Sequence, residues 1–166
     1  MIKVKDHQLQ EAAEQGMDEF VSVFTSAILE SIGGSFENSD ISQLNSDQVS
    51  LIAYVTLRDE IMDGGFVQLI HNGYGPFFFR GPFAKAMKEW GLDGLSSLIK
   101  KAHRLYDKHH KAIEVDCSED EFMQLFEQFP MFDDLDDDFV ENEETWTEQI
   151  AHYIDDNIEK FAIVEK

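Results

Sequence analysis

Apolar residues recur at intervals of three and four along nearly the whole of this 166-residue chain, and this spacing is typical of packed α-helices. The first series predicts one helix over residues 6–32, ended by Gly33-Gly34. A polar loop and a second helix follow, and the second helix ends at Asp63-Gly64-Gly65. No two runs alternate apolar and polar residues as half-buried strands do. The sequence therefore predicts an all-α fold, and its length fits one compact domain over residues 1–166.

The rest of the chain continues the helical pattern. Glycine, proline and capping residues set the expected helix boundaries. They predict a short helix over 66–71, a helix from Pro82 to Trp90 and a longer helix that begins at Asp93. A further helix is expected to begin at the capping box Ser118–Glu121 and to end at Pro130, and a terminal helix is expected over 146–161. Between them, Phe77, Phe78, Phe79 and Phe83 are expected in the core, with a partner-binding patch as the alternative.

Charge is distributed unevenly along the chain. The sequence has 34 Asp and Glu against 13 Lys and Arg, a formal net charge of −21. Residues 1–111 carry only −4 of it, and eight of their cations lie in residues 80–111, whereas residues 112–166 carry −17. Such acidity argues against nucleic acid or an anionic membrane as a direct partner and favours a basic protein. We call residues 112–166 the acidic C-terminal region.

The candidate partner-binding residues are carboxylates of this region: Asp133, Asp134, Asp136, Asp137, Asp138, Glu141, Glu143, Glu144, Glu148, Asp155 and Asp156. If the region covers about a third of the protein surface, its net charge density is roughly one negative charge per 165 Å² of surface. This is within a factor of two of duplex DNA, which has about one charge per 105 Å². Two alternatives remain open. The segment could be a solvated, partly disordered tract, or it could pack on the basic stretch 80–111 of its own chain or of a second copy.

A second pattern lies at the predicted corner between helices. It consists of Glu60, Asp63, Gly64, Gly65, Phe66, Gln68, Asn72 and Gly75, within the run from Glu60 to Gly75. Here the chain resembles the bacterial DNA-mimic protein family, whose shared C-terminal domain carries a Glu, an Asn-Gly-Gly-Phe, a Gln and an Asn before a glycine-containing turn. Asp63 stands where the family usually has Asn, and either side chain suits such a turn. The resemblance extends over a core of about residues 49–110.

The resemblance implies a helical, dimeric, non-enzymatic protein that occupies the DNA-binding surface of a transcription factor, such as a helix-turn-helix regulator. The corner residues by themselves are those of a structural turn, remote in sequence from the acidic run. Two other functions stay open: an acidic immunity-type inhibitor of a basic toxin, and a small-ligand or hydrolytic domain with a pocket at Glu60, Gln68 and Asn72.

Other kinds of site find little support in the residues, and we expect no cofactor and no metal site. Asp134, Asp136 and Asp138 have the first spacings of an EF-hand, but Phe139 and Thr145 replace its glycine and its glutamate. Cys117 is the only cysteine, and the carboxylates beside it disfavour the thiolate that a nucleophile needs, so catalysis with a distant histidine is a minor alternative. With no apolar leader and no apolar membrane span, we expect a soluble cytoplasmic protein.

Overall fold

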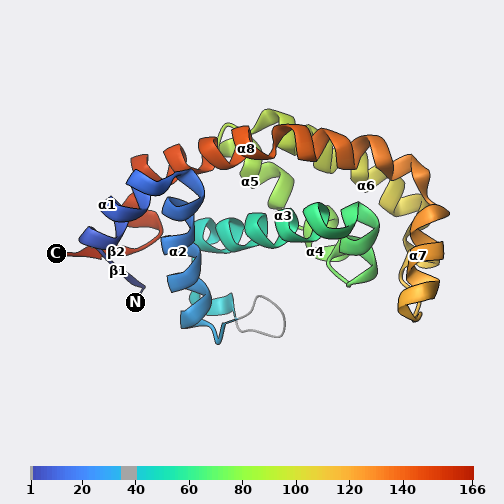
Figure 1. Cartoon of the computed structure of the whole chain (residues 1–166), viewed down its shortest axis with the longest axis horizontal. Helices are drawn as coiled ribbons and strands as arrows, with labels where there is room; N and C mark the ends of the chain where they lie inside the picture. Colours follow the sequence, from blue (N-terminus) through green and yellow to red (C-terminus); the bar gives the residue numbers. More distant parts are fainter. Residues whose placement is uncertain (1, 35–40) are drawn as a thin grey trace. The chain divides into compact units, whose positions relative to one another are not determined.

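The computed structural model describes residues 2–34 and 41–166, and helices make up most of them (Figure 1). The all-α prediction is confirmed. Contacts group the chain into two compact units: unit 1 comprises Met1–Thr56 and Glu144–Lys166, and unit 2 comprises Leu57–Glu143. That residues 1–166 fold as one domain stays a prediction. The predicted polar loop after Gly34 lies mainly outside the described residues.

Unit 1 contains both ends of the described chain. Its elements are β1 (Lys3–Lys5), α1 (Asp6–Gln15), α2 (Met17–Ser31), η1 (Ile41–Gln43), the beginning of α3 (Ser46–His71), the end of α8 (Asp133–Asp156), η3 (Ile158–Lys160) and β2 (Ile163–Glu165). β1 and β2 pair in parallel, with Val4 opposite Val164 (Figure 1). The sequence did not predict this pair, because strands of three residues are too short for an alternating pattern to show.

The predicted single helix over residues 6–32 is wrong at one residue. Gly16 has φ 151° and ψ 175°, so the helix breaks there into α1 and α2. Glycine adopts this backbone conformation at little steric cost because it has no Cβ. The apolar spacing on both sides of the break is helical, and for this reason periodicity alone did not reveal it.

The core of unit 1 brings together residues from both of its sequence segments. Phe24 and Phe161 are fully buried, and their ring centroids lie 6.4 Å apart. Tyr54 Oη and Thr147 Oγ1, both buried, are hydrogen-bonded at 2.8 Å. Gln48 donates to the Phe161 carbonyl at 2.9 Å, so the beginning of α3 is also joined to the last residues of the chain by a polar contact.

Unit 2 contains the remaining elements: the end of α3, α4 (Gly75–Arg80), α5 (Phe83–Glu89), α6 (Asp93–Ile113), α7 (Glu119–Glu127), η2 (Pro130–Phe132) and the beginning of α8. Its core is rich in aromatic side chains. Phe66 is fully buried, with its ring centroid 6.4 Å from those of Phe79 and Phe132. Phe78, Phe79 and Phe83 are buried as predicted, and Phe77 is half-buried.

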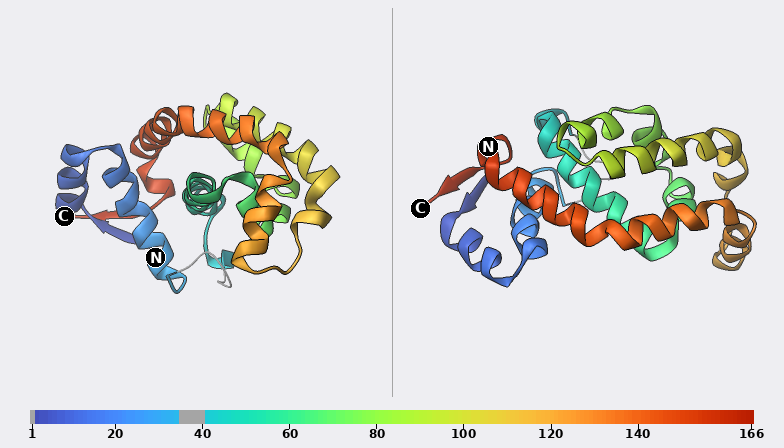
Figure 2. Two further views of the ribbon diagram at one scale, coloured as in Figure 1. Left: turned by 45° about the vertical axis from the view of Figure 1, so that its right-hand side comes forward. Right: turned by 90° about the horizontal axis from the view of Figure 1, so that it is seen from above.

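The predicted terminal helix has the wrong boundaries. Helix α8 begins at Asp133, not Trp146, and ends at Asp156, so the run of aspartates is helical (Figure 2). Leu135 and Phe139 are buried and extend the apolar side of the helix toward its N-terminus. Aspartates in the first turn also interact favourably with the helix dipole. The alternative of a disordered acidic segment does not hold for residues 133–156.

Candidate functional site

The first part of α8 displays five exposed carboxylates within unit 2: Asp133, Asp134, Asp137, Asp138 and Glu141. At about 100° per residue, their positions fall within roughly 140° of one another around the helix. At a rise of about 1.5 Å per residue, they provide roughly one charge per 3 Å of helix axis, close to the spacing of phosphates along one DNA strand, ~3.4 Å. We call these five residues the α8 acidic face.

The last part of α8, in unit 1, is less densely charged. Its exposed carboxylates are Glu144, Glu148, Asp155 and Asp156, and Glu148 lies 3.7 Å from His152. Glu144, Glu148 and Asp155 share a helix side, because their spacings of four and seven bring the chain back to nearly the same angle. This part of the helix provides only about one charge per 5 Å of axis.

Asp136 differs from the other aspartates of α8. Its Oδ1 accepts a hydrogen bond from the backbone N–H of Phe66 at 2.8 Å, so it contacts the break in α3. Burial raises the pKa of Asp136 from 3.8 to about 6, the Phe66 hydrogen bond opposes that rise, and the charges of Asp133 and Asp137 add to it. The structure therefore gives Asp136 an intramolecular contact, although it was predicted to face a partner.

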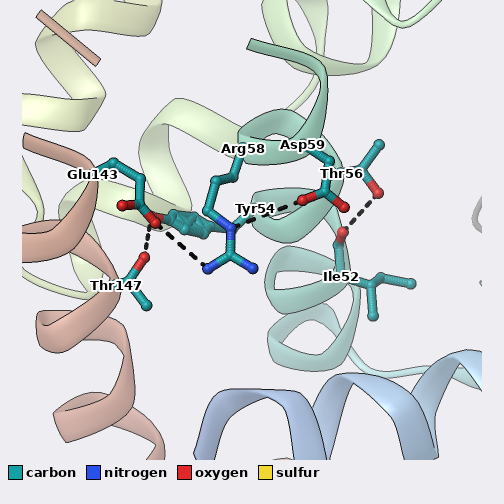
Figure 3. Close-up of polar contacts among 7 residues, drawn as sticks. All are labelled: Ile52, Tyr54, Thr56, Arg58, Asp59, Glu143 and Thr147. Carbon is teal, nitrogen blue, oxygen red and sulfur yellow. Dashed lines mark hydrogen bonds and ion pairs between the residues drawn. The ribbon is translucent and has the colours of Figure 1, made fainter. Parts of the chain in front are cut away.

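Glu143 also has an intramolecular contact. One carboxylate oxygen lies 3.7 Å from Arg58 Nη1, and the side chains of Glu143 and Arg58 are only 14% and 20% exposed (Figure 3). Arg58 Nε is also 3.9 Å from Asp59 (Figure 3). Glu143 thus forms an ion pair within unit 2.

The sequence contains a signal that distinguishes these two carboxylates from the others, and the prediction of a partner-binding role overlooked it. Asp136 and Glu143 are seven residues apart, and Phe139, which is fully buried, lies between them at helical spacing from each. Residues three or four apart share a helix side, so both carboxylates belong to the apolar side of α8. A charged residue on an apolar side is expected to have a partner within the fold.

The EF-hand spacing forms no calcium loop. Asp134, Asp136 and Asp138 lie within helix α8, where residues two apart point to different sides. Among the described residues, no group of three or more His, Cys, Asp or Glu side chains is placed to hold a metal ion.

The Glu60–Gly75 motif forms a sharp break in α3. Gly65 has φ 74° and ψ −173°, a conformation essentially restricted to glycine. A Cβ on Gly65 would overlap the Asp136 carboxylate, and one on Gly75 would overlap the Tyr106 ring. Phe66, which follows Gly65 in the sequence, is fully buried. The motif therefore contains the break, and residues 66–71 form the part of α3 after it.

The polar residues of the motif bind one another. Gln68 Nε2 donates to Glu60 Oε2 at 2.8 Å and to Asp63 Oδ2 at 3.0 Å. Asn72 Nδ2 donates to the same Glu60 oxygen at 2.9 Å. Glu60 thus holds two amide groups across the break, as expected of a structural corner.

Two cavities lie beside this break, both within unit 2. The first, about 580 Å³, is lined by Gln68, His71, Asn72, Cys117, Ser118, Glu119, Asp120, Phe122 and Met123. The second, about 370 Å³, is lined by Ile61, Asp63, Gly64, Gly65, Phe126, Asp133, Asp136 and Asp137. The second cavity places a motif carboxylate and three α8 carboxylates around one hollow. The structure therefore connects the motif with the acidic run, which are far apart in sequence.

The basic stretch 80–111 leaves the α8 acidic face uncovered. In the described part of unit 2, no lysine or arginine lies within salt-bridge distance of its five carboxylates. The Arg80 guanidinium instead lies over the Tyr106 ring, 5.3 Å from its centroid.

Among the described helices, none combines the length and the apolarity needed to cross a bilayer.

Comparison with known proteins places the chain in a family. Residues 42–157 match the family described as DMP19-like protein, a range that contains the motif, both cavities and all of α8. The chain is also 34% identical over 155 residues to the DNA mimic protein DMP19 of Neisseria meningitidis serogroup B, covering 92% of this chain and 93% of that protein. The helical fold, the glycine break and the dense carboxylate surface thus belong to a member of the DMP19-like family of DNA mimic proteins.

Proposed function

We propose that this chain binds the DNA-binding surface of a basic protein, such as a helix-turn-helix regulator, and blocks its access to DNA without any enzymatic activity. The α8 acidic face carries the proposal. Its five exposed carboxylates are spaced along the helix like phosphates of a DNA strand, and no basic side chain of unit 2 neutralises them in the described residues. The related protein is called a DNA mimic, which supports the same role.

The cavity at the break in α3 adds a place for a cationic side chain. Its wall includes Asp63 from α3 and Asp133 and Asp137 from α8. A lysine or arginine of the partner, which would otherwise contact a phosphate, can extend into this hollow and meet carboxylates from two elements. We infer that Asp136, also in the wall, acts mainly by holding the α8 acidic face against the break.

The experiment compares two variants that each lose four carboxylates. In D133N/D134N/D137N/D138N four of the five carboxylates of the α8 acidic face are removed, whereas Asp136 is kept because its contact is intramolecular. In the control E11Q/E14Q/E19Q/E30Q, four glutamates of α1 and α2 are changed. Both variants have the same net charge, so any difference between them depends on position.

Each immobilised protein is exposed to a bacterial lysate near physiological salt, and duplex DNA is then added as competitor. The wild type and the control are expected to retain the same DNA-binding protein and to release it to DNA, and the α8 variant is expected to lose it. Equal retention by both variants, each with wild-type circular dichroism, would contradict the proposal. Retention of a basic toxin that DNA does not release would favour the inhibitor alternative.

A further inference from the structure

We propose that Cys117 is a modification site at which the thiol, with His71 as its proton acceptor, forms a mixed disulfide with small neutral or cationic disulfides. Cys117 lies between α6 and α7, next to Ser118, whose hydroxyl caps α7. Its Sγ is 3.8 Å from Nε2 of His71, which is on α3, 46 residues earlier in the sequence. Both residues line the 580 Å³ cavity. The site is separate from the α8 acidic face.

The other side of the His71 ring determines which nitrogen can take the proton. His71 Nδ1 is 3.0 Å from the backbone carbonyl oxygen of Ile113. A carbonyl oxygen only accepts hydrogen bonds, so Nδ1 carries the hydrogen of the neutral ring and Nε2 has a free lone pair. That lone pair faces the Cys117 thiol, which is therefore the donor. The ring is also packed against Phe122, with 5.0 Å between the centroids, and this fixes its orientation.

The geometry supports a balanced exchange reaction. The thiol proton moves to His71 Nε2, and the Cys117 sulfur attacks one sulfur of a disulfide RSSR. The S–S bond of RSSR breaks, a new S–S bond joins Cys117 to one R–S group, and the other leaves as a thiolate that takes the proton back from His71. Cys117 is oxidised, one half of the reagent is reduced, and no further oxidant is needed.

The cavity indicates which disulfides can enter. Phe122 and Met123 form an apolar wall, and Met123 is 60% exposed. Gln68, Asn72 and Ser118 provide polar groups, and Glu119 and Asp120 place two exposed carboxylates at the wall. These charges repel an anionic disulfide and attract a cationic one. We therefore expect cystamine, a small dication, to react faster than glutathione disulfide.

The first test measures the rate at which cystamine adds to the full chain near pH 7.5, followed by intact mass spectrometry. The wild type is expected to gain one half of the reagent, at Cys117, and C117S is expected to gain none. H71Q is expected to react at least about tenfold more slowly, because the thiol loses its proton acceptor. In denaturant the two chains should react equally, since the contact is lost. An H71Q rate equal to the wild type, with unchanged circular dichroism, would overturn the proposal.

The second test leaves His71 unchanged and examines the cavity. The ratio of the cystamine rate to the glutathione disulfide rate is measured for the wild type, for E119Q/D120N and for the matched control E148Q/D155N, whose residues lie in unit 1. The ratio is expected to fall by about threefold or more in the cavity variant and to change little in the control. Equal ratios in both variants would show that the reagent does not use this cavity, and would overturn the proposal even if H71Q fails to fold.

Discussion

Asp136 accepts a hydrogen bond from the backbone N–H of Phe66, with 2.8 Å between Oδ1 and N. Gly65, the residue before Phe66, has a backbone conformation that only glycine adopts readily, and it leaves no room for a Cβ beside the same carboxylate. One aspartate of the acidic run thus completes the corner that the Glu60–Gly75 motif builds. The glycine, the Phe66 N–H and the carboxylate form one unit of structure.

Replacing Asp136 tests this hydrogen bond. D136N keeps an oxygen that can accept from Phe66 N–H, whereas D136A leaves the N–H of this fully buried residue without an acceptor. We expect D136A to unfold with about 1–3 kcal/mol less free energy than D136N, measured by urea denaturation at pH 7. D137A and D137N, at an exposed position, should differ by less than about 0.5 kcal/mol. Equal stability of D136A and D136N would contradict the contact.

The raised pKa of Asp136 predicts a pH dependence. The pKa is about 6 in the folded chain against an ordinary value of 3.8, so the folded chain binds this proton more tightly than the unfolded chain does. The free energy of unfolding should therefore increase as the pH falls from about 7 to about 4. D136N has no such proton, and its stability should increase less over the same range. Parallel curves for the two proteins would contradict the shift.

Replacing Gly65 with alanine is expected to strain the backbone. G65A places a Cβ against the Asp136 carboxylate and imposes φ 74° and ψ −173° on an L-residue. We expect a loss of about 1–3 kcal/mol in the free energy of unfolding. G94A, in the first turn of α6, is the matched control and should be neutral or slightly stabilising, because alanine favours helix. A G65A protein as stable as G94A would show that the break is absent.

The pair of Arg58 and Glu143 predicts an effect on stability rather than on partner binding. A double-mutant cycle with R58M and E143Q should give a coupling energy of about 0.5–1.5 kcal/mol, since both side chains are largely buried. E143Q alone should leave the affinity for the retained DNA-binding protein nearly unchanged. A loss of affinity as large as that of the α8 variant would place Glu143 in the interface.

Salt provides a separate test of the proposed function. Affinity for the retained partner should fall as the salt concentration rises, because the carboxylates replace phosphates in charge pairs. D133N/D134N/D137N/D138N should show a shallower dependence of log affinity on log salt concentration, whereas E11Q/E14Q/E19Q/E30Q should keep the wild-type slope. Titration calorimetry at three salt concentrations would measure both. Equal slopes would mean that the α8 acidic face does not pair with the partner's cations.

The sequence by itself determined the helical class and the glycine break. Hydrogen bonds between residues four apart give the helix about 3.6 residues per turn, so side chains three or four apart lie on one side. The spacing of apolar residues in the sequence therefore indicates where a helix forms. The positions of Gly64, Gly65 and Phe66 likewise predicted the corner, because a sharp turn often needs backbone dihedral angles that only glycine adopts readily. Five of the candidate carboxylates between Asp133 and Glu141 are exposed, and their role in binding a partner stays a prediction.

Only the tertiary structure decided which charged and reactive side chains have partners within the fold. Asp136 binds the N–H of a residue 70 positions away, and Cys117 contacts a histidine 46 positions away. β1 pairs with β2 from the other end of the chain. Such contacts depend on how the helices pack, and no local spacing encodes them. Local hydrogen bonding therefore made the helices predictable, whereas packing decided which carboxylates are exposed and which have contacts within the fold.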